Sequence, residues 1–153
     1  MVDDIAKLRE RVQFMHEQIG SDALVEEYIE GRELYVGMLG NERLTRMPVW
    51  EMRFGSLPDS LPAIATRKVK WDRAYQRRYD ITTRAADDLP PPVLQQLDRL
   101  SRRIYRALHL SGCARIDFRV RTDGSVFMLE ANPNPNLARE EDFACLLYTS
   151  RCV

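Results

Sequence analysis

The sequence predicts an α+β fold in which a mostly antiparallel sheet packs with helices, and three observations lead to this prediction. Residues 114–137 alternate apolar and polar positions around Asp123-Gly124, which is the strongest short-range signal for a β-hairpin. Residues 3–19 and 90–108 carry apolar residues at intervals of three and four, as amphipathic helices do. Extended stretches lie between those helices, so a chain of 153 residues is expected to form one α+β domain.

The first helix is expected at residues 3–19. Asp3 or Asp4 can accept hydrogen bonds from the free amides of its first turn, and Gly20 can end it in a left-handed conformation. Only Met1 and Val2 precede the capping residues, so we expect no complete substrate-binding domain before this helix. Its apolar stripe is formed by Ile5, Leu8, Val12, Met15 and Ile19.

Four extended stretches are expected to follow. Glycines and a loop rich in proline and serine, at residues 55–62, separate them. After the last stretch, residues 72–89 form a long polar connection without a clear period. The stretches span residues 23–29, 33–39, 44–54 and 63–71.

The second helix is expected at residues 90–108. Three consecutive prolines, residues 90–92, introduce it, because proline is tolerated in the first turn of a helix and not in its interior. One side of the helix is apolar and the other is rich in arginine. A solvated helix surface explains those arginines better than contact with an acidic partner does.

The register of the predicted hairpin brings two acids together. With Asp123-Gly124 as the loop, Arg121 lies opposite Val126, Arg119 opposite Met128, Asp117 opposite Glu130, and Arg115 opposite Asn132. The core face would then carry Ile116, Phe118 and Val120 against Ala131, Leu129 and Phe127.

Asp117 and Glu130 are expected to repel each other, because like charges on facing strand positions are destabilising. A magnesium ion would remove this repulsion, since Mg²⁺ prefers carboxylate and carbonyl oxygens, and Asn132 adds an amide oxygen nearby. Alternatively, the two acids pair with Arg115 and Arg119 on a solvated sheet face.

Composition limits the possible partners. Lys plus Arg equal Asp plus Glu at 23 each, so the net charge is zero and nucleic acid is not an expected partner. No apolar run approaches the roughly 20 residues that span a bilayer, and no signal peptide is visible. Three cysteines without a metal-type spacing favour a reducing compartment. We therefore expect a cytoplasmic protein without a membrane partner.

Three motifs follow one another along the chain: EEYIEGRE at residues 26–33, RIDF at residues 115–118 and LEANPNP at residues 129–135. Together they resemble the C-terminal part of ATP-grasp ligases, and most closely enzymes similar to D-alanine:D-alanine ligase. The resemblance implies a partial ATP-grasp domain, the C-terminal subdomain, at residues 1–147. Residues 148–153 resemble nothing in the family and are interpreted as a tail, which follows a last helix beginning at Glu140.

The resemblance also implies site roles. Asp117, Glu130 and Asn132 match the ligands of Mg²⁺ or Mn²⁺, which agrees with the hairpin register. Arg115 and the backbone amide of Asn136 match the groups that stabilise a tetrahedral intermediate. The implied ATP-binding residues are Glu26, Glu27 and Ile29 beside the adenine, Glu33 at the ribose and Lys70 near the transferring phosphate.

The activity implied by the resemblance is ligation of a carboxylate to an amine through an acylphosphate, with an amino acid or peptide as substrate. The family's substrate domain and its glycine-rich phosphate-binding subdomain are not found in the sequence, so we expect a fragment that is inactive alone. Full-length relatives often form homodimers. Asn136 replaces a glycine common in D-alanine ligases, which leaves the amine open. The alternatives are a non-catalytic nucleotide- or metal-binding module and a small interaction domain.

Overall fold

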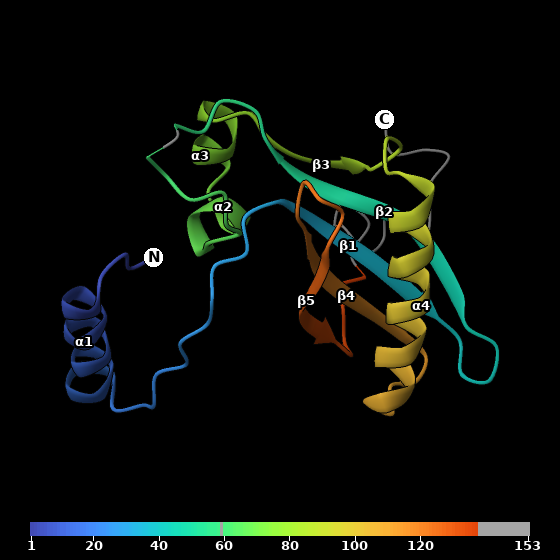
Figure 1. The fold of residues 1–153 in the computed structure, drawn as a ribbon, viewed down its shortest axis with the longest axis horizontal. Coiled ribbons are helices and arrows are strands. Elements are labelled where there is room, and N and C mark those ends of the chain that lie inside the picture. The colour runs from blue at the N-terminus through green and yellow to red at the C-terminus, as the bar shows by residue number, and fades with distance from the viewer. Residues whose placement is uncertain (59, 138–153) are drawn as a thin grey trace.

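The computed structural model describes residues 1–58 and 60–137, and its centre is a five-stranded sheet (Figure 1). All neighbouring strands are antiparallel, in the order β3-β2-β1-β4-β5. This arrangement confirms the predicted α+β fold with a mostly antiparallel sheet. The strands are β1 (Arg32–Leu39), β2 (Thr45–Phe54), β3 (Ile81–Ala85), β4 (Cys113–Val120) and β5 (Val126–Asn132).

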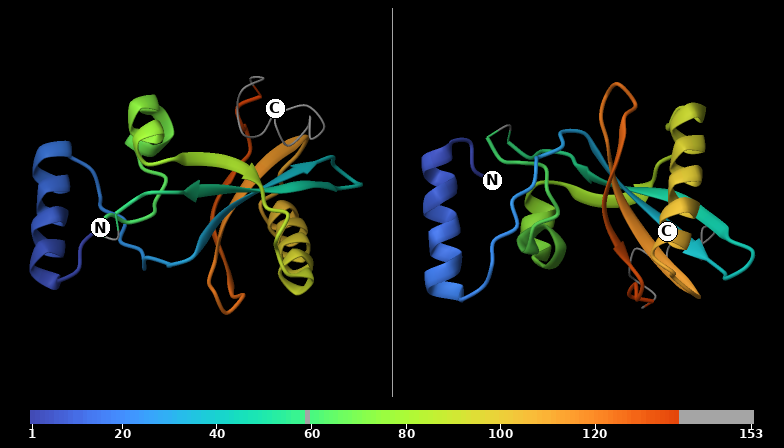
Figure 2. Two further views of the ribbon diagram at one scale, coloured as in Figure 1. Left: turned by 90° about the horizontal axis from the view of Figure 1, so that it is seen from above. Right: turned by 60° about the horizontal axis from the view of Figure 1, so that its bottom comes forward.

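The N-terminal helix forms where it was predicted but stands apart from the sheet (Figures 1 and 2). It comprises α1 (Ile5–Phe14) and a π-helical turn, η1 (Met15–Ile19). Asp4 caps it by accepting a hydrogen bond from the Lys7 amide, and Gly20 ends it at φ 71°. No residue of α1 is buried, so its apolar stripe does not contribute to the core of the described residues.

The predicted strand at residues 23–29 is wrong, because this segment is an irregular linker between η1 and β1. Its alternation of residue types resembled a strand, yet Leu24 is 84% exposed and Val25 is 56% exposed. A strand needs a neighbour for its backbone groups and its apolar side chains. Within the described residues, the sheet provides none here.

One face of the sheet is covered by α4 (Pro91–Ala107), which confirms the second predicted helix. Pro91 occupies its first turn, where proline needs no amide partner. Its side chains pack on residues that alternate along β1 and β4. The fully buried members of this core include Leu34, Val36, Leu97, Tyr105, Ile116 and Phe118.

Two short helices cover part of the opposite face, and both differ from the prediction. Residues 63–71 were predicted as a strand but contain α2 (Arg67–Trp71), and residues 72–89 contain α3 (Arg73–Arg78) and strand β3. Side-chain caps explain the difference: Thr66 accepts from the Val69 amide, and Asp72 accepts from the amides of Ala74 and Tyr75. Helices this short carry too few residues for a visible period.

The β4–β5 hairpin confirms half of the predicted register. Asp117 faces Glu130 and Arg115 faces Asn132, as predicted. Beyond Asp117 a bulge shifts the register by one, so the predicted pairs of Arg119 with Met128 and of Arg121 with Val126 are wrong.

The shift follows from a loop longer than two residues. The Arg121 amide donates to the Ser125 carbonyl at 3.0 Å, and the Asp123 carboxylate accepts from the Ser125 amide at 2.8 Å. Phe127 therefore lies opposite Arg119, away from the α4 core, and Leu129 is 45% exposed. Both were predicted on the core face.

Candidate functional site

The sheet face opposite α4 carries buried polar residues in its two central strands. Glu33 and Tyr35 of β1 lie across from Arg119 and Asp117 of β4. Strand alternation places these side chains on the face that α4 does not cover, while their sequence neighbours form the core. Glu33, Asp117 and Arg119 are each at most 5% exposed. Buried charges of this kind require partners, and the strands supply them.

Arg115 is the main partner of Asp117. Its Nε and Nη2 donate to the two carboxylate oxygens at 2.8 and 3.0 Å, and its guanidinium lies over the Tyr35 ring at 5.0 Å. Burial raises the pKa of Asp117 to about 6, although the hydrogen bonds and charge of Arg115 oppose that rise. The facing Glu130 raises it further. The structure thus confirms the facing positions of the two acids, where like charges destabilise each other.

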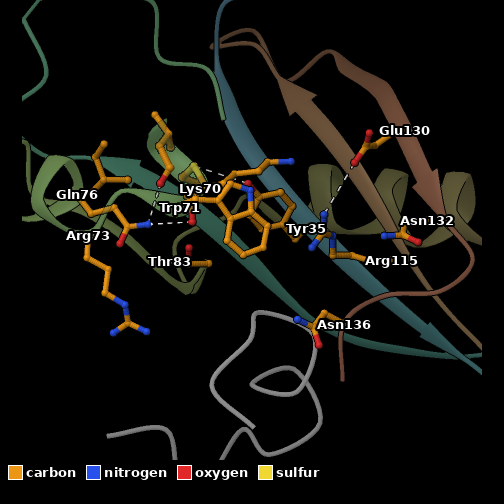
Figure 3. Close-up of a pocket in the computed structure, with 13 residues that line it drawn as sticks. Tyr35, Lys70, Trp71, Arg73, Gln76, Thr83, Arg115, Glu130, Asn132 and Asn136 are labelled. Atoms are coloured by element: carbon orange, nitrogen blue, oxygen red, sulfur yellow. Dashed lines mark hydrogen bonds and ion pairs between the residues drawn. The ribbon is translucent and has the colours of Figure 1, made fainter. Parts of the chain in front are cut away.

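Two cavities adjoin along this face. The larger, of about 550 Å³, lies between the β4–β5 hairpin and α2–α3 (Figure 3). The smaller, of about 270 Å³, lies between the hairpin and the linker that precedes β1. Lys70 and Glu130 line both cavities, so they mark the boundary where the two meet.

The ten site residues predicted from the sequence all line one or both cavities. The predicted nucleotide-binding residues line the smaller cavity and the predicted catalytic residues line the larger one. Lys70 and Glu130 line both cavities. The smaller cavity holds Glu26, Glu27, Ile29, Glu33, Lys70, Asp117 and Glu130. The larger holds Lys70, Arg115, Glu130, Asn132 and Asn136.

The three predicted metal ligands offer oxygen atoms on one side of the cavities. Glu130 is 58% exposed along its side chain and reaches toward Arg115, at 3.9 Å, while Asn132 Oδ1 accepts from the Asn134 amide at 2.9 Å. Among the described residues, no three His, Cys, Asp or Glu side chains lie together so that they could hold a metal ion. Two carboxylates and an amide nevertheless fit Mg²⁺, which keeps water or phosphate oxygens as its other ligands.

Several cavity residues were not predicted. Tyr35 follows Glu33 by two positions in β1, so strand alternation alone would have placed it beside the acid. Trp71, Arg73 and Gln76 come from α2 and α3, the region interpreted as a strand and a polar connection. No sequence signal pointed to them, because their position depends on how those helices fold back on the sheet.

A family model described as D-ala D-ala ligase C-terminus matches residues 2–149, nearly the whole chain. The chain belongs to the D-alanine–D-alanine ligase family. Within this ATP-grasp ligase family, it is 31% identical over 119 residues to the D-alanine–D-alanine ligase of Bordetella petrii, covering 76% of this chain and 32% of that protein. It is also 27% identical over 150 residues to the uncharacterized protein y4sG of Sinorhizobium fredii, covering 98% of this chain and 43% of the relative.

Solved structures of D-alanine–D-alanine ligases share the fold. The Coxiella burnetii ligase aligns with a TM-score of 0.72 at 22% identity, over 97% of this chain and 35% of that one. The Bacillus anthracis ligase, complexed with ATP, aligns with a TM-score of 0.71 at 19% identity, over 97% and 42%. The chain thus spans less than half the length of these relatives and corresponds to their C-terminal part.

The described residues contain no helix with the length and apolar character needed to cross a membrane. The predicted helix from Glu140 and the predicted tail at residues 148–153 lie outside the described residues. The boundary at residue 147 stays a prediction.

Proposed function

We propose that this chain is the C-terminal part of an ATP-dependent ligase that joins a carboxylate to an amine through an acylphosphate. The observation that carries the proposal is the convergence of all ten predicted site residues on two adjoining cavities. These residues come from the linker, β1, α2, β4, β5 and the segment after β5, which are far apart in the sequence.

The smaller cavity is the proposed nucleotide site. Glu26, Glu27 and Ile29 line it from the linker and would border the adenine, and Glu33 would accept hydrogen bonds from the ribose. Lys70, at the boundary of the cavities, would contact the transferring phosphate. Phosphoryl transfer depends mainly on positioning and charge neutralisation, and these residues can provide both.

Asp117, Glu130 and Asn132 are the proposed ligands of Mg²⁺ or Mn²⁺. The bound ion would neutralise charge on the phosphates of ATP. Arg115 uses one lone pair of each Asp117 oxygen, and a carboxylate has about four acceptor sites, so acceptor capacity remains. The facing positions of Asp117 and Glu130, where like charges destabilise each other, support a cation at this position.

The larger cavity is the proposed site of amide formation. An oxygen of the substrate carboxylate attacks the γ-phosphorus of ATP, which gives an acylphosphate and releases ADP. The amine then attacks the carbonyl carbon, inorganic phosphate leaves, and the amine loses a proton. Arg115 and the backbone amide of Asn136 would stabilise the negative oxygen that develops in this second step.

The proposed substrates are small amino acids or peptides. The curated relative from Bordetella petrii is named a D-alanine–D-alanine ligase, and a solved relative is named a D-Ala:D-Ser ligase. D-Alanine is therefore the first acid to test, with D-alanine and D-serine as amines. Homodimer formation by the full-length protein and a cytoplasmic location are proposed on the family resemblance and on composition.

The test combines ATP binding with turnover. We expect the 153-residue chain to bind ATP with Mg²⁺ and to release no ADP with D-alanine or D-serine, because the chain covers only 32% of the Bordetella relative. Asp117→Asn should weaken magnesium-dependent ATP binding at least about tenfold, because even the partners that orient a metal's ligands contribute about that much to metal affinity. Asp87→Asn, which changes an exposed loop carboxyl, is the matched control. Equal affinities of the two variants would contradict the metal assignment, and rapid ADP release would contradict the expected inactivity.

A further inference from the structure

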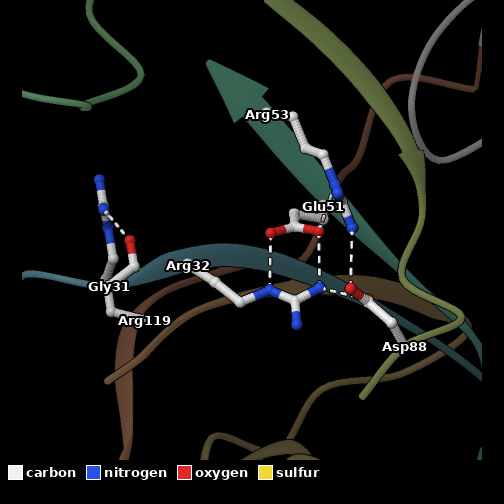
Figure 4. A network of polar contacts seen from close by, with 6 residues as sticks. All are labelled: Gly31, Arg32, Glu51, Arg53, Asp88 and Arg119. Carbon is white, nitrogen blue, oxygen red and sulfur yellow. Dashed lines mark hydrogen bonds and ion pairs between the residues drawn. The ribbon is translucent and has the colours of Figure 1, made fainter. Parts of the chain in front are cut away.

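Arg119 is the buried cation of the smaller cavity, and no role has been assigned to it. Its side chain is 3% exposed. Nη2 donates to Glu33 Oε2 at 2.8 Å and also to the Ala63 carbonyl. Nη1 donates to the Gly31 carbonyl at 2.8 Å (Figure 4). The guanidinium also lies over the Tyr28 ring, 5.7 Å from its centre.

These contacts join three segments that border the cavity. Gly31 and Tyr28 belong to the linker, Glu33 belongs to β1, and Ala63 precedes α2. The linker is held close to β4, since Gly31 has φ +146° and a Cβ there would lie 2.2 Å from the Val120 carbonyl oxygen. A lysine could not make these contacts together, because only the planar guanidinium donates in several fixed directions.

Arg119 also fixes the direction of the Glu33 carboxylate. Oε2 accepts from Arg119, and Oε1 accepts from the Tyr35 hydroxyl at 2.9 Å. Two hydrogen bonds leave about two of the four acceptor sites of the carboxylate for a ligand. Glu33 is 5% exposed and lines the cavity, so a ligand must meet the carboxylate in the orientation that these two partners impose.

We propose that Arg119 is a positioning residue that holds Glu33 and the linker so that the smaller cavity recognises the ribose hydroxyls of its nucleotide. This inference rests on the proposed function, which assigns the nucleotide to that cavity. It adds that selectivity for ribose depends on a side chain that need not touch the ribose itself.

The test compares the affinities of ATP and 2′-deoxy-ATP for the 153-residue chain by calorimetric titration with Mg²⁺. The unmodified chain should prefer ATP by about tenfold, as expected for a hydrogen bond to a charged acceptor. Glu33→Gln should lower that preference. Arg119→Lys should also lower it, by weakening ATP binding while leaving 2′-deoxy-ATP binding nearly unchanged. Arg103→Met, on the exposed side of α4, should keep the preference.

The outcomes separate the two proposals. A merely structural loss would weaken both nucleotides equally and leave the preference intact, which would overturn the positioning role. The positioning role is also overturned if Glu33→Gln loses the preference for ATP and Arg119→Lys keeps it. The proposed function would be unaffected by that result. If the unmodified chain binds neither nucleotide, the proposed function fails and the inference fails with it. Should circular dichroism show Arg119→Lys to be unfolded, Arg119→Gln takes its place, with the same expected loss.

Discussion

At the scale of single residues, ion pairs lie on both faces of the sheet. Besides the pairs of Arg115 with Asp117 and of Arg119 with Glu33, a third pair occupies the α4 side of the sheet (Figure 4). There Arg32 donates to both oxygens of Glu51 at 2.7 Å. Arg53 and Asp88 complete this third network.

The third network predicts a stability effect for Arg32. Arg32→Met should lower the free energy of unfolding by about 2–3 kcal/mol, because it removes two hydrogen bonds from a Glu51 side chain that is only 6% exposed. The loss stays below that of a fully unpaired charge, since Arg53 still contacts Glu51 at 2.8 Å. Urea unfolding measures the change. Arg103→Met, on the exposed side of α4, should stay within about 0.5 kcal/mol, and equal values for both variants would contradict the expectation.

The site residues were predictable to the extent that they lie in motifs or on alternating strand positions. Asp117 and Glu130 followed from the hairpin signal and strand alternation, and both lie where that register put them. The ion pair of Arg119 with Glu33 was not predictable from spacing, because the two residues are 86 positions apart and meet only through the pairing of β1 with β4.

At the scale of elements, the local sequence pattern predicted some helices and strands, and tertiary packing determined the others. The helix at residues 90–108 was predictable because its apolar stripe and its prolines agree. Residues 63–71 favoured a strand by composition but contain a capped helical turn, in which Val69 is 3% exposed. Val69 packs there in a smaller core cluster with Tyr35, Met52 and Ile81. The bulge next to Asp117 could not be predicted from the sequence either. The Asp-Gly signal favours a two-residue loop, and nothing in the local sequence indicates a longer one.

The linker supplies a prediction at this scale. Gly31→Ala should destabilise the protein by more than about 2 kcal/mol, because the added Cβ would overlap the Val120 carbonyl at 2.2 Å and φ is +146°. The displaced linker should also weaken ATP binding.

Gly20→Ala is the control for this prediction. Gly20 also has positive φ, at +71°, but a Cβ there meets nothing within 4 Å. It should cost about 1 kcal/mol, the usual strain of a left-handed residue, and leave ATP binding unchanged. Thermal unfolding and ATP titration of both variants make the comparison, and equal destabilisation would contradict a role for close packing at Gly31.

At the scale of the whole molecule, the two faces of the sheet differ: one packs against α4, and the other carries the candidate site. α4 and the larger core cluster occupy one face, while both cavities open on the other, between the hairpin, the linker and the α2–α3 pair. α1 contributes no buried residue and lies away from the sheet (Figure 2). The proposed nucleotide site therefore lies between the linker and the β4–β5 hairpin, away from α4 and α1.

Photolabelling with 8-azido-ATP in the presence of Mg²⁺, followed by mass spectrometry of peptides, tests this location directly. The account predicts labelled residues in the linker, around Glu26 to Ile29, and in β5 near Leu129, all of which line the smaller cavity. Excess ATP should suppress the labelling, and Asp117→Asn should reduce it. Labelling confined to α4 or α1, or labelling that excess ATP leaves unchanged, would contradict the central claim.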